Sequence, residues 1–376
     1  MRRIAILALG GLSLVLSGCP VGASRATPAP PVADAPALPD VASVIIVNSL
    51  GESLSRYDPT QSPPALANDL VLTGQSPNDV VLAGDRILVV NSLSNSVGLY
   101  DLATLTLQHE WSTGPRTNPW NGLVLGDTAW VSCWASQELV GLDLTDGAIV
   151  ARLAAPSTEL PHDDGLTTRA YPQGVAATLN GATLLVTCAN LGDSFSAAGA
   201  GVVWMIDVAS APPITRGLIA LSSGRNAADI IRTTVAGREA FVVVCAGDFD
   251  AASGYVGNGS FHLIDGPTLS ELAAIPVASA PVRVTAYGSQ AFGAGAQEGD
   301  VSHVDLADRS ARPIIVLPDS GTGLNYCSAL AVTDPDHLLA LDFNGDRLYA
   351  IEVSTGTVSG GLTVGDGPVA LVVVPK

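Results

Sequence analysis

The chain has 376 residues, of which 47% are hydrophobic, 14% charged and 5% aromatic, so it can build a sizeable core and is not disordered over most of its length. Its 17 basic and 35 acidic residues give a formal net charge of −18, which excludes nucleic-acid binding because nothing would neutralise a run of phosphates. Few charges beside 39 Gly and 25 Pro favour strands and turns over surface helices.

The amino terminus has the pattern of an export signal. Arg2 and Arg3 precede an apolar stretch over residues 4–16 that is too short to span a bilayer. The following Leu16-Ser17-Gly18-Cys19 resembles the lipobox of bacterial lipoproteins, which implies cleavage after residue 18 and acylation of Cys19. An ordinary signal peptide cut near Ala23 is the alternative. Lipidation would anchor the protein to a membrane without spanning it.

Residues 19–40 form the next predicted unit, a stalk. Six prolines lie there among Ala, Val and Thr, a composition that favours extended polyproline conformations and cannot bury a core. Pro20 directly follows Cys19, where an aspartate would often signal retention in the inner membrane. The sequence therefore favours the outer membrane of the bacterial envelope, on its periplasmic side or at the cell surface.

A repeat begins at Val41 and continues to the last residue. In each copy a short apolar strand ends at one position, called the marked position below, and a second strand ends at an acidic residue. In five copies the acidic residue lies ten residues after the marked position. The marked positions are Asn48, Asn91, Cys133, Cys188, Cys245, Gly295 and Asp342. Cys188 and Cys245 are followed by longer gaps, which indicate insertions. A period in the forties to fifties with four short strands per unit predicts propeller blades.

The ends of the repeat region complement each other. The chain finishes on an apolar run after Gly367 that has no following strands, and the repeat starts at Val41 without an innermost strand. We therefore predict an all-β, seven-bladed β-propeller with four-stranded blades over residues 41–376, closed when the carboxy-terminal strand completes the amino-terminal blade. Closure leaves no free sheet edge.

The repeat resembles that of the YVTN-type β-propeller family. The strands ending at Asn91 and at Asp207 and the Thr355-Gly356 turn stand in the places of that family's Tyr-Val-x-Asn strand, Val-x-Val-Ile-Asp strand and Thr-Gly turn. The resemblance implies the fold. It implies little about function, because such propellers include surface-layer proteins, periplasmic binders, scaffolds and lactonase-like enzymes.

Three long segments are expected side by side on one face of the ring. They are the connection between blades three and four over residues 154–172, an insertion in blade four over 190–201, and an insertion in blade five over 247–259. Enlarged loops on one face of a rigid scaffold are where such folds acquire function. We expect the ligand-binding site in this sector, with Trp134 as a further candidate to line it.

Arginines support the same sector. Arg116, Arg169 and Arg225 stand at matching points where blades three, four and five open. Three guanidiniums at the channel rim would bind a carboxylate or phosphate. The alternative is that each pairs with a carboxylate of a neighbouring blade and holds the ring together.

Acidic residues of these loops are candidate metal ligands. His162 is followed by Asp163 and Asp164, and Asp193, Asp248 and Asp250 lie in the two insertions. Carboxylate oxygens suit one divalent cation such as Ca²⁺ or Mg²⁺. The alternative is a set of solvated loop acids. The run from Asp342 to Asp346 has a calcium-like alternation but is interpreted as a hairpin turn.

Four cysteines fall within the repeats. Cys133, Cys188 and Cys245 take equivalent positions in successive blades, and Cys327 lies near the innermost strand of blade seven. Packing between blades, one disulfide bridge (Cys133–Cys188 or Cys188–Cys245) and a soft-metal site are the alternatives, and packing is favoured because equivalent positions on adjacent blades tend to be too far apart for a bridge.

No nucleophile elbow, phosphate loop or zinc-protease helix is present in the sequence, and His109, His262 and His303 fall in strand patterns where core or surface roles are expected. We therefore predict a monomeric, non-enzymatic, membrane-anchored binding propeller that recognises an envelope protein, a glycan or a small anionic ligand. A lactonase-like or other metal-dependent hydrolase using the acidic loop residues is the alternative, and a purely structural role in the envelope, with no ligand, is a third possibility.

Overall fold

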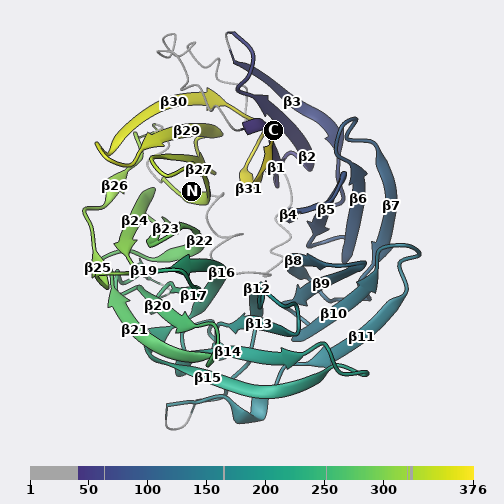
Figure 1. Ribbon diagram of the computed structural model, residues 1–376, viewed down its shortest axis with the longest axis vertical. Coiled ribbons are helices and arrows are strands. Elements are labelled where there is room, and N and C mark those ends of the chain that lie inside the picture. Colours follow the sequence, from purple (N-terminus) through teal and green to yellow (C-terminus); the bar gives the residue numbers. More distant parts are fainter. Residues whose placement is uncertain (1–40, 63, 164–165, 251, 320, 322–324) are drawn as a thin grey trace.

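The computed structural model describes residues 41–376 except 63, 164–165, 251, 320 and 322–324. The proposed signal peptide, Cys19 and the stalk lie outside the described residues. Seven antiparallel sheets stand around a central channel, which confirms the seven-bladed propeller (Figure 1). Among the described residues, none belongs to a helix long and apolar enough to cross a bilayer.

Each blade runs from an innermost strand at the channel to an outer strand at the rim. The innermost strands are β31 (Pro368–Pro375), β4 (Pro77–Ala83), β8 (Pro119–Leu125), β12 (Pro172–Ala177), β16 (Ala227–Val235), β22 (Pro281–Tyr287) and β27 (Cys327–Asp334). The second strands are β1 (Val41–Asn48), β5 (Arg86–Asn91), β9 (Thr128–Cys133), β13 (Thr183–Cys188), β17 (Arg238–Cys245), β23 (Gln290–Gly295) and β28 (His337–Asp342). Every marked position of the repeat is therefore the last residue of a second strand.

The third and outer strands complete the blades. The third strands are β2 (Ser53–Asp58), β6 (Ser96–Asp101), β10 (Glu138–Asp143), β14 (Ala200–Asp207), β20 (Ser260–Asp265), β24 (Asp300–Asp305) and β29 (Arg347–Glu352). Six outer strands are β3 (Ala65–Leu72), β7 (Leu107–Ser112), β11 (Ile149–Ala154), β15 (Ile214–Arg225), β21 (Ser270–Pro276) and β30 (Thr357–Thr363). The outer edge of blade six is split into β25 (Ser310–Ala311) and β26 (Ile315–Val316), which both pair with β24. Pro313 lies between the two pieces and has no N–H to continue the ladder.

The ring closes through β1 and β31, as the repeat phase predicted. The two strands pair antiparallel from Asn48 opposite Pro368 to Val41 opposite Pro375. Blade one is thus built from both ends of the repeat region.

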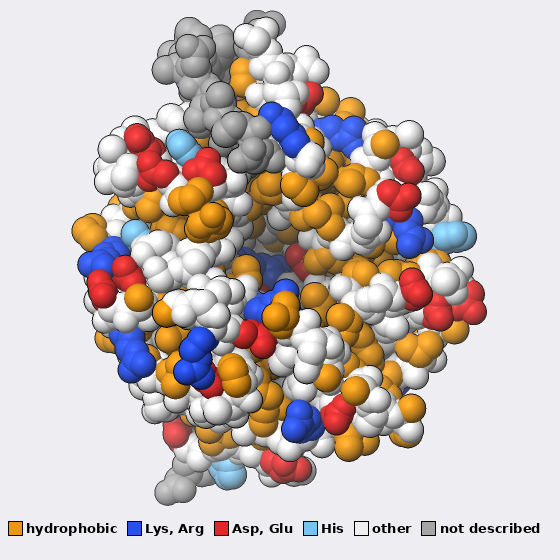
Figure 2. All heavy atoms as spheres, viewed as in Figure 1, with side chains coloured by type: hydrophobic (Ala, Val, Ile, Leu, Met, Phe, Trp, Pro, Cys, Tyr) orange, Lys and Arg blue, Asp and Glu red, His pale blue; other side chains and the backbone are white. Residues whose placement is uncertain are grey.

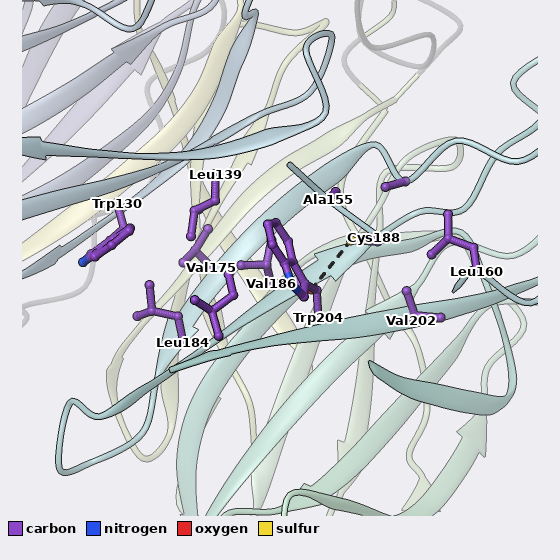
Figure 3. Packing of buried hydrophobic residues seen from close by; sticks show 12 residues of the cluster. Trp130, Leu139, Ala155, Leu160, Val175, Leu184, Val186, Cys188, Val202 and Trp204 are labelled. Atoms are coloured by element: carbon purple, nitrogen blue, oxygen red, sulfur yellow. Dashed lines mark hydrogen bonds between the residues drawn. The ribbon is translucent and has the colours of Figure 1, made fainter. Parts of the chain in front are cut away.

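The core lies between the blades. Each pair of adjacent blades encloses its own cluster of buried apolar side chains; Figure 3 shows the one between blades three and four, where Trp130, Val175 and Trp204 meet. Successive side chains of a strand point to opposite faces of the sheet. Every inner strand of a blade therefore contributes to the clusters on both sides of that blade. Burial of this kind contributes about 25 cal/mol per Å² of apolar surface.

The four described cysteines are free thiols and buried. Cys133, Cys188, Cys245 and Cys327 pack in four different clusters, each between a different pair of blades. The packing interpretation therefore agrees with the structure, and neither of the two bridges considered is formed. Burial raises the pKa of the Cys133 and Cys188 thiols to about 12, so neither is a reactive thiolate at neutral pH.

The channel wall is tied together by the third residue of several innermost strands. Asp79 on β4 accepts a hydrogen bond from Gly122 N on β8 (2.9 Å), and Asn121 on β8 accepts one from Val175 N on β12 (3.1 Å). Asp229 on β16 accepts one from Val284 N on β22 (3.0 Å). Each hydrogen bond runs from one blade to the next, so these side chains link neighbouring blades along the channel wall.

Arg283 takes the same position on β22 and reaches across the channel. Its Nη2 donates to the carbonyl oxygen of Asn78 on β4, in a blade that is not its neighbour, at 3.1 Å. Figure 2 shows basic and acidic atoms inside the central hollow. Burial raises the pKa of Asp79 to about 6 and also raises that of Asp229, and the positive charge of Arg283 offsets part of both shifts.

Candidate functional site

The three long segments lie on the face that carries the loops between second and third strands, called the top face below. The connection between blades three and four packs on the blade-four insertion: Asn190 Nδ2 donates to Pro161 O (2.6 Å) and Asp163 N to Ala198 O (2.8 Å). The blade-five insertion contains a two-stranded hairpin, β18 (Phe249–Asp250) and β19 (Gly254–Tyr255), that the repeat pattern did not indicate. The segments that the repeat phase grouped are therefore brought together.

Arg225 joins all three segments. Its Nε donates to Asp248 Oδ1 (2.7 Å), and its Nη2 donates to Asp163 Oδ2 (2.9 Å) and to Ala197 O (2.9 Å). Burial alone would lower the pKa of the guanidinium, but the bonds to Asp163 and Asp248 outweigh it and raise the pKa. Arg225 is the last residue of β15, two residues before β16. Because its hydrogen bonds reach all three loops, it serves as a tie that links them.

The other two arginines differ from Arg225. Arg169 pairs with Asp193 (3.2 Å), and both side chains are half exposed or more. Arg116 is exposed and forms no ion pair with any residue that the structure describes. The three arginines therefore do not form one cluster of unpaired cations; two of them already face carboxylates of the loops.

The candidate metal ligands are mostly occupied by other partners. Asp163 and Asp248 bind Arg225, and Asp193 binds Arg169. Asp250 accepts from Ser253 N, Ser253 Oγ and Ala252 N, which holds the hairpin turn and lowers the pKa of this carboxyl.

The remaining candidate ligands are Asp164 and His162. Asp164 lies outside the described residues, and the exposed His162 has its Nδ1 3.2 Å from Leu160 O. Over residues 41–376, the masked positions aside, no group of three or more His, Cys, Asp or Glu side chains is placed to hold a metal ion.

Trp134 is buried rather than exposed to a ligand. Only 6% of its surface is accessible, and it stacks on Tyr171 (ring centroids 4.2 Å apart) and Phe195 (5.7 Å), with Trp120 at 6.5 Å. These partners could not be predicted from the sequence, because they come from three different segments. The stack packs against the blade-four insertion through Phe195 and leaves Trp120 and Phe195 half-buried.

Blade five contains a serine, a histidine and a carboxylate in line. Ser260 Oγ lies 2.8 Å from His262 Nε2, and His262 Nδ1 lies 2.5 Å from Glu271 Oε1. His262 is fully buried, Ser260 is 5% exposed, and a Cβ on Gly224 would overlap the imidazole. This burial leaves no room for a substrate beside Ser260 Oγ, so the three side chains are not a catalytic site. Their hydrogen bonds hold β20 against its neighbours.

No protein-family model and no curated protein matches the chain. Solved propellers do resemble it. A putative 6-phosphogluconolactonase from Bacteroides fragilis has a TM-score of 0.67 at 14% identity, over 91% of this chain and 100% of that one.

Two further propellers give similar values. A functionally unknown protein from Desulfotomaculum acetoxidans has a TM-score of 0.62 at 11% identity, over 88% and 98% of the two chains. Hydrazine synthase from Kuenenia stuttgartiensis has a TM-score of 0.60 at 16% identity, over 90% and 93%. At such identities the likeness shows the fold alone, and these neighbours include enzymes as well as a protein of unknown function.

Proposed function

We propose that this chain is a non-enzymatic binding propeller of the bacterial envelope, of the YVTN type, anchored through a lipid on Cys19. Its binding surface is the top face of blades three to five. The tie at Arg225 carries the proposal, because it holds three loops from three places in the chain as one preorganised surface. Preorganised loops reduce the ordering cost of binding a partner.

An envelope protein is the partner that this surface favours. Two of its guanidiniums already face carboxylates, which leaves little positive charge for a small anion. Leu166 is 47% exposed beside these charges, and a surface of mixed charge with an apolar contact point is typical of protein interfaces.

The alternative, a lactonase-like or other metal-dependent hydrolase, draws on the neighbour described as a putative 6-phosphogluconolactonase. Against it stand the ion pairs that occupy Asp163, Asp193 and Asp248. A hydrolase of this kind would have to break these pairs in order to bind its metal.

The test places a photoreactive amino acid at position 166 in the full chain and irradiates intact cells. Position 179, where Leu179 is 73% exposed in a turn between β12 and β13 on the opposite face, is the matched control. A discrete crosslinked protein from position 166 that is missing from position 179 supports the proposal. The same products from both positions, or none from either, contradict it.

Two further measurements test the lipid anchor and the hydrolase alternative. Cys19→Ser is expected to move the protein from the membrane fraction to the soluble fraction, and the wild-type amino-terminal peptide is expected to carry acyl chains by mass spectrometry. One tightly bound divalent cation per chain, with a melting temperature that falls on chelation and on Asp163→Asn but not on Asp146→Asn, would instead favour the hydrolase.

A further inference from the structure

A separate pocket opens on the top face between blades five and six. Its volume is about 120 Å³, and it is lined by Tyr255 of the blade-five insertion, by Ala278 and Ser279, and by Gln297, Glu298 and Asp300 of blade six. None of the arginines discussed above lines it. It therefore borders the surface proposed for a protein partner, shares the blade-five insertion with it, and lies apart from the ion pairs of Arg225.

The charge of the pocket has one sign. Among the described residues that line it, Asp300 and Glu298 are the only charged ones and none is basic. Asp300 is 4% exposed, and its carboxyl accepts a hydrogen bond from Ser279. A buried carboxylate without a cation is costly, because desolvation penalises the charged form.

Contacts between its lining residues hold the pocket in shape. Tyr255 N donates to Gln297 Oε1 at 2.6 Å, which joins its two walls. A Cβ on Gly254 would lie 2.5 Å from the same oxygen, so the close approach requires glycine, which also adopts a φ of +83° there. Phe249 packs edge-on against Tyr255 at 5.2 Å and holds that wall in place.

We propose that this pocket binds a small primary ammonium compound, with Asp300 as its counter-ion. Two carboxylates exclude anions, and one ammonium group replaces the missing positive charge with charge-assisted hydrogen bonds. Tyr255 offers an aromatic wall to the methylene groups of the ligand. A cavity of ~150 Å³ holds benzene, so this one suits a ligand of about four to six non-hydrogen atoms.

Proton linkage gives a second signature. Burial and the negative charge of Glu298 together raise the pKa of Asp300 to about 6, although hydrogen bonds from its own backbone N–H and from the Ser279 hydroxyl oppose the rise. The other titratable groups facing this carboxyl are Cys327 and Tyr255, which lies in the wall. Burial and the charge of Asp300 both raise the pKa of the Cys327 thiol. An ammonium ion favours the ionised carboxylate, so its binding releases a proton at pH 5.5 and none at pH 8.

The test titrates the purified full chain calorimetrically with n-butylammonium, and with 1-butanol as the neutral probe of the same shape. Saturable binding of n-butylammonium, with at least about tenfold weaker binding of 1-butanol, is expected because a hydrogen bond to a charged group contributes roughly 1.5–3 kcal/mol. Repeating the titration at pH 5.5 in two buffers of different ionisation enthalpy measures the released proton. A capped lysine that binds more tightly than n-butylammonium would keep the ammonium chemistry and assign it to a protein segment.

Three variants locate the site. Asp300→Asn, which keeps the shape, is expected to weaken n-butylammonium binding at least about tenfold and to abolish proton release. Ala278→Phe fills the mouth from an exposed position without removing a carboxylate and is expected to block binding. Asp127→Asn removes an exposed carboxylate in the turn between β8 and β9, on the opposite face, and serves as the control. Equal binding of both probes, no binding to the wild type, or unchanged binding to Asp300→Asn would overturn the proposal.

Discussion

Asp300 occupies in blade six the space that a side chain on Gly295 would need: a Cβ on Gly295 would overlap Oδ1 of Asp300. Gly295 is the last residue of the second strand of blade six, and Asp300 is the first residue of the third. In blades one and two the same places hold Asn48 with Ser53 and Asn91 with Ser96, joined by hydrogen bonds of 3.0 and 3.3 Å. Blade six has thus exchanged a neutral amide–hydroxyl pair for a glycine and a buried carboxylate.

This exchange predicts strong coupling between the two positions. Gly295→Asn alone is expected to lower the free energy of unfolding by about 1–3 kcal/mol, because the new side chain meets Asp300. Gly295→Asn with Asp300→Ser recreates the pair of blades one and two and is expected to recover most of that loss. Urea unfolding of the wild type, both single variants and the double variant measures the coupling. Additive effects within about 0.5 kcal/mol would contradict the exchange.

Replacement of Asp79 by a neutral residue is expected to raise the free energy of unfolding by an amount that depends on pH. Burial raises the pKa of Asp79 to about 6 from its usual 3.8, so as the pH rises between these values the unfolded chain loses its proton first and stability falls. Asp79→Asn keeps an oxygen for Gly122 N and carries no charge. It is expected to raise the free energy of unfolding by about 1–2 kcal/mol at pH 7.5, after allowance for channel water, and by nothing near pH 3.5.

Chemical unfolding at the two pH values checks this prediction. Asp127→Asn, at an exposed position in the turn between β8 and β9, is the matched control and is expected to leave both values unchanged. A gain of the same size at both pH values would show that the effect of Asp79→Asn is not electrostatic.

Removal of Arg225 is expected to loosen the top face without unfolding the ring. Arg225→Ala breaks the ion pairs to Asp163 and Asp248, and we expect faster amide hydrogen exchange in residues 154–162 and 246–250. The free energy of unfolding is expected to fall by about 1–2 kcal/mol. Arg169→Ala removes one exposed pair and is expected to cost less than about 0.5 kcal/mol. Unchanged exchange in Arg225→Ala would exclude its role as a tie.

The buried thiols give a chemical test of the core. In a chain carrying Cys19→Ser, the four remaining cysteines are expected to react with a thiol reagent only after unfolding, since all four are free and buried. A reductant is expected to leave the melting temperature unchanged. Fewer than four reactive thiols in the unfolded, unreduced protein would point to a disulfide bridge.

The fold could be predicted because the repeat fixes the phase of every blade. Asn48 and Asp342 are far apart in sequence, yet each ends a second strand, since the ten-residue gap to the next acidic residue repeats the same hairpin. The phase also placed three loops in one sector. It could not supply the partners of Arg225 or the stack around Trp134, because contacts between loops depend on distances that no period encodes.

The pairing of β1 with β31 has a consequence for biogenesis. When β1 emerges during synthesis, the strand that will cover its inner edge is still several hundred residues away, so that edge stays open until β31 has been made. Such long-range pairing makes folding slow and leaves an unpaired strand exposed to aggregation or capture by chaperones. The ring therefore cannot close before β31 has been made.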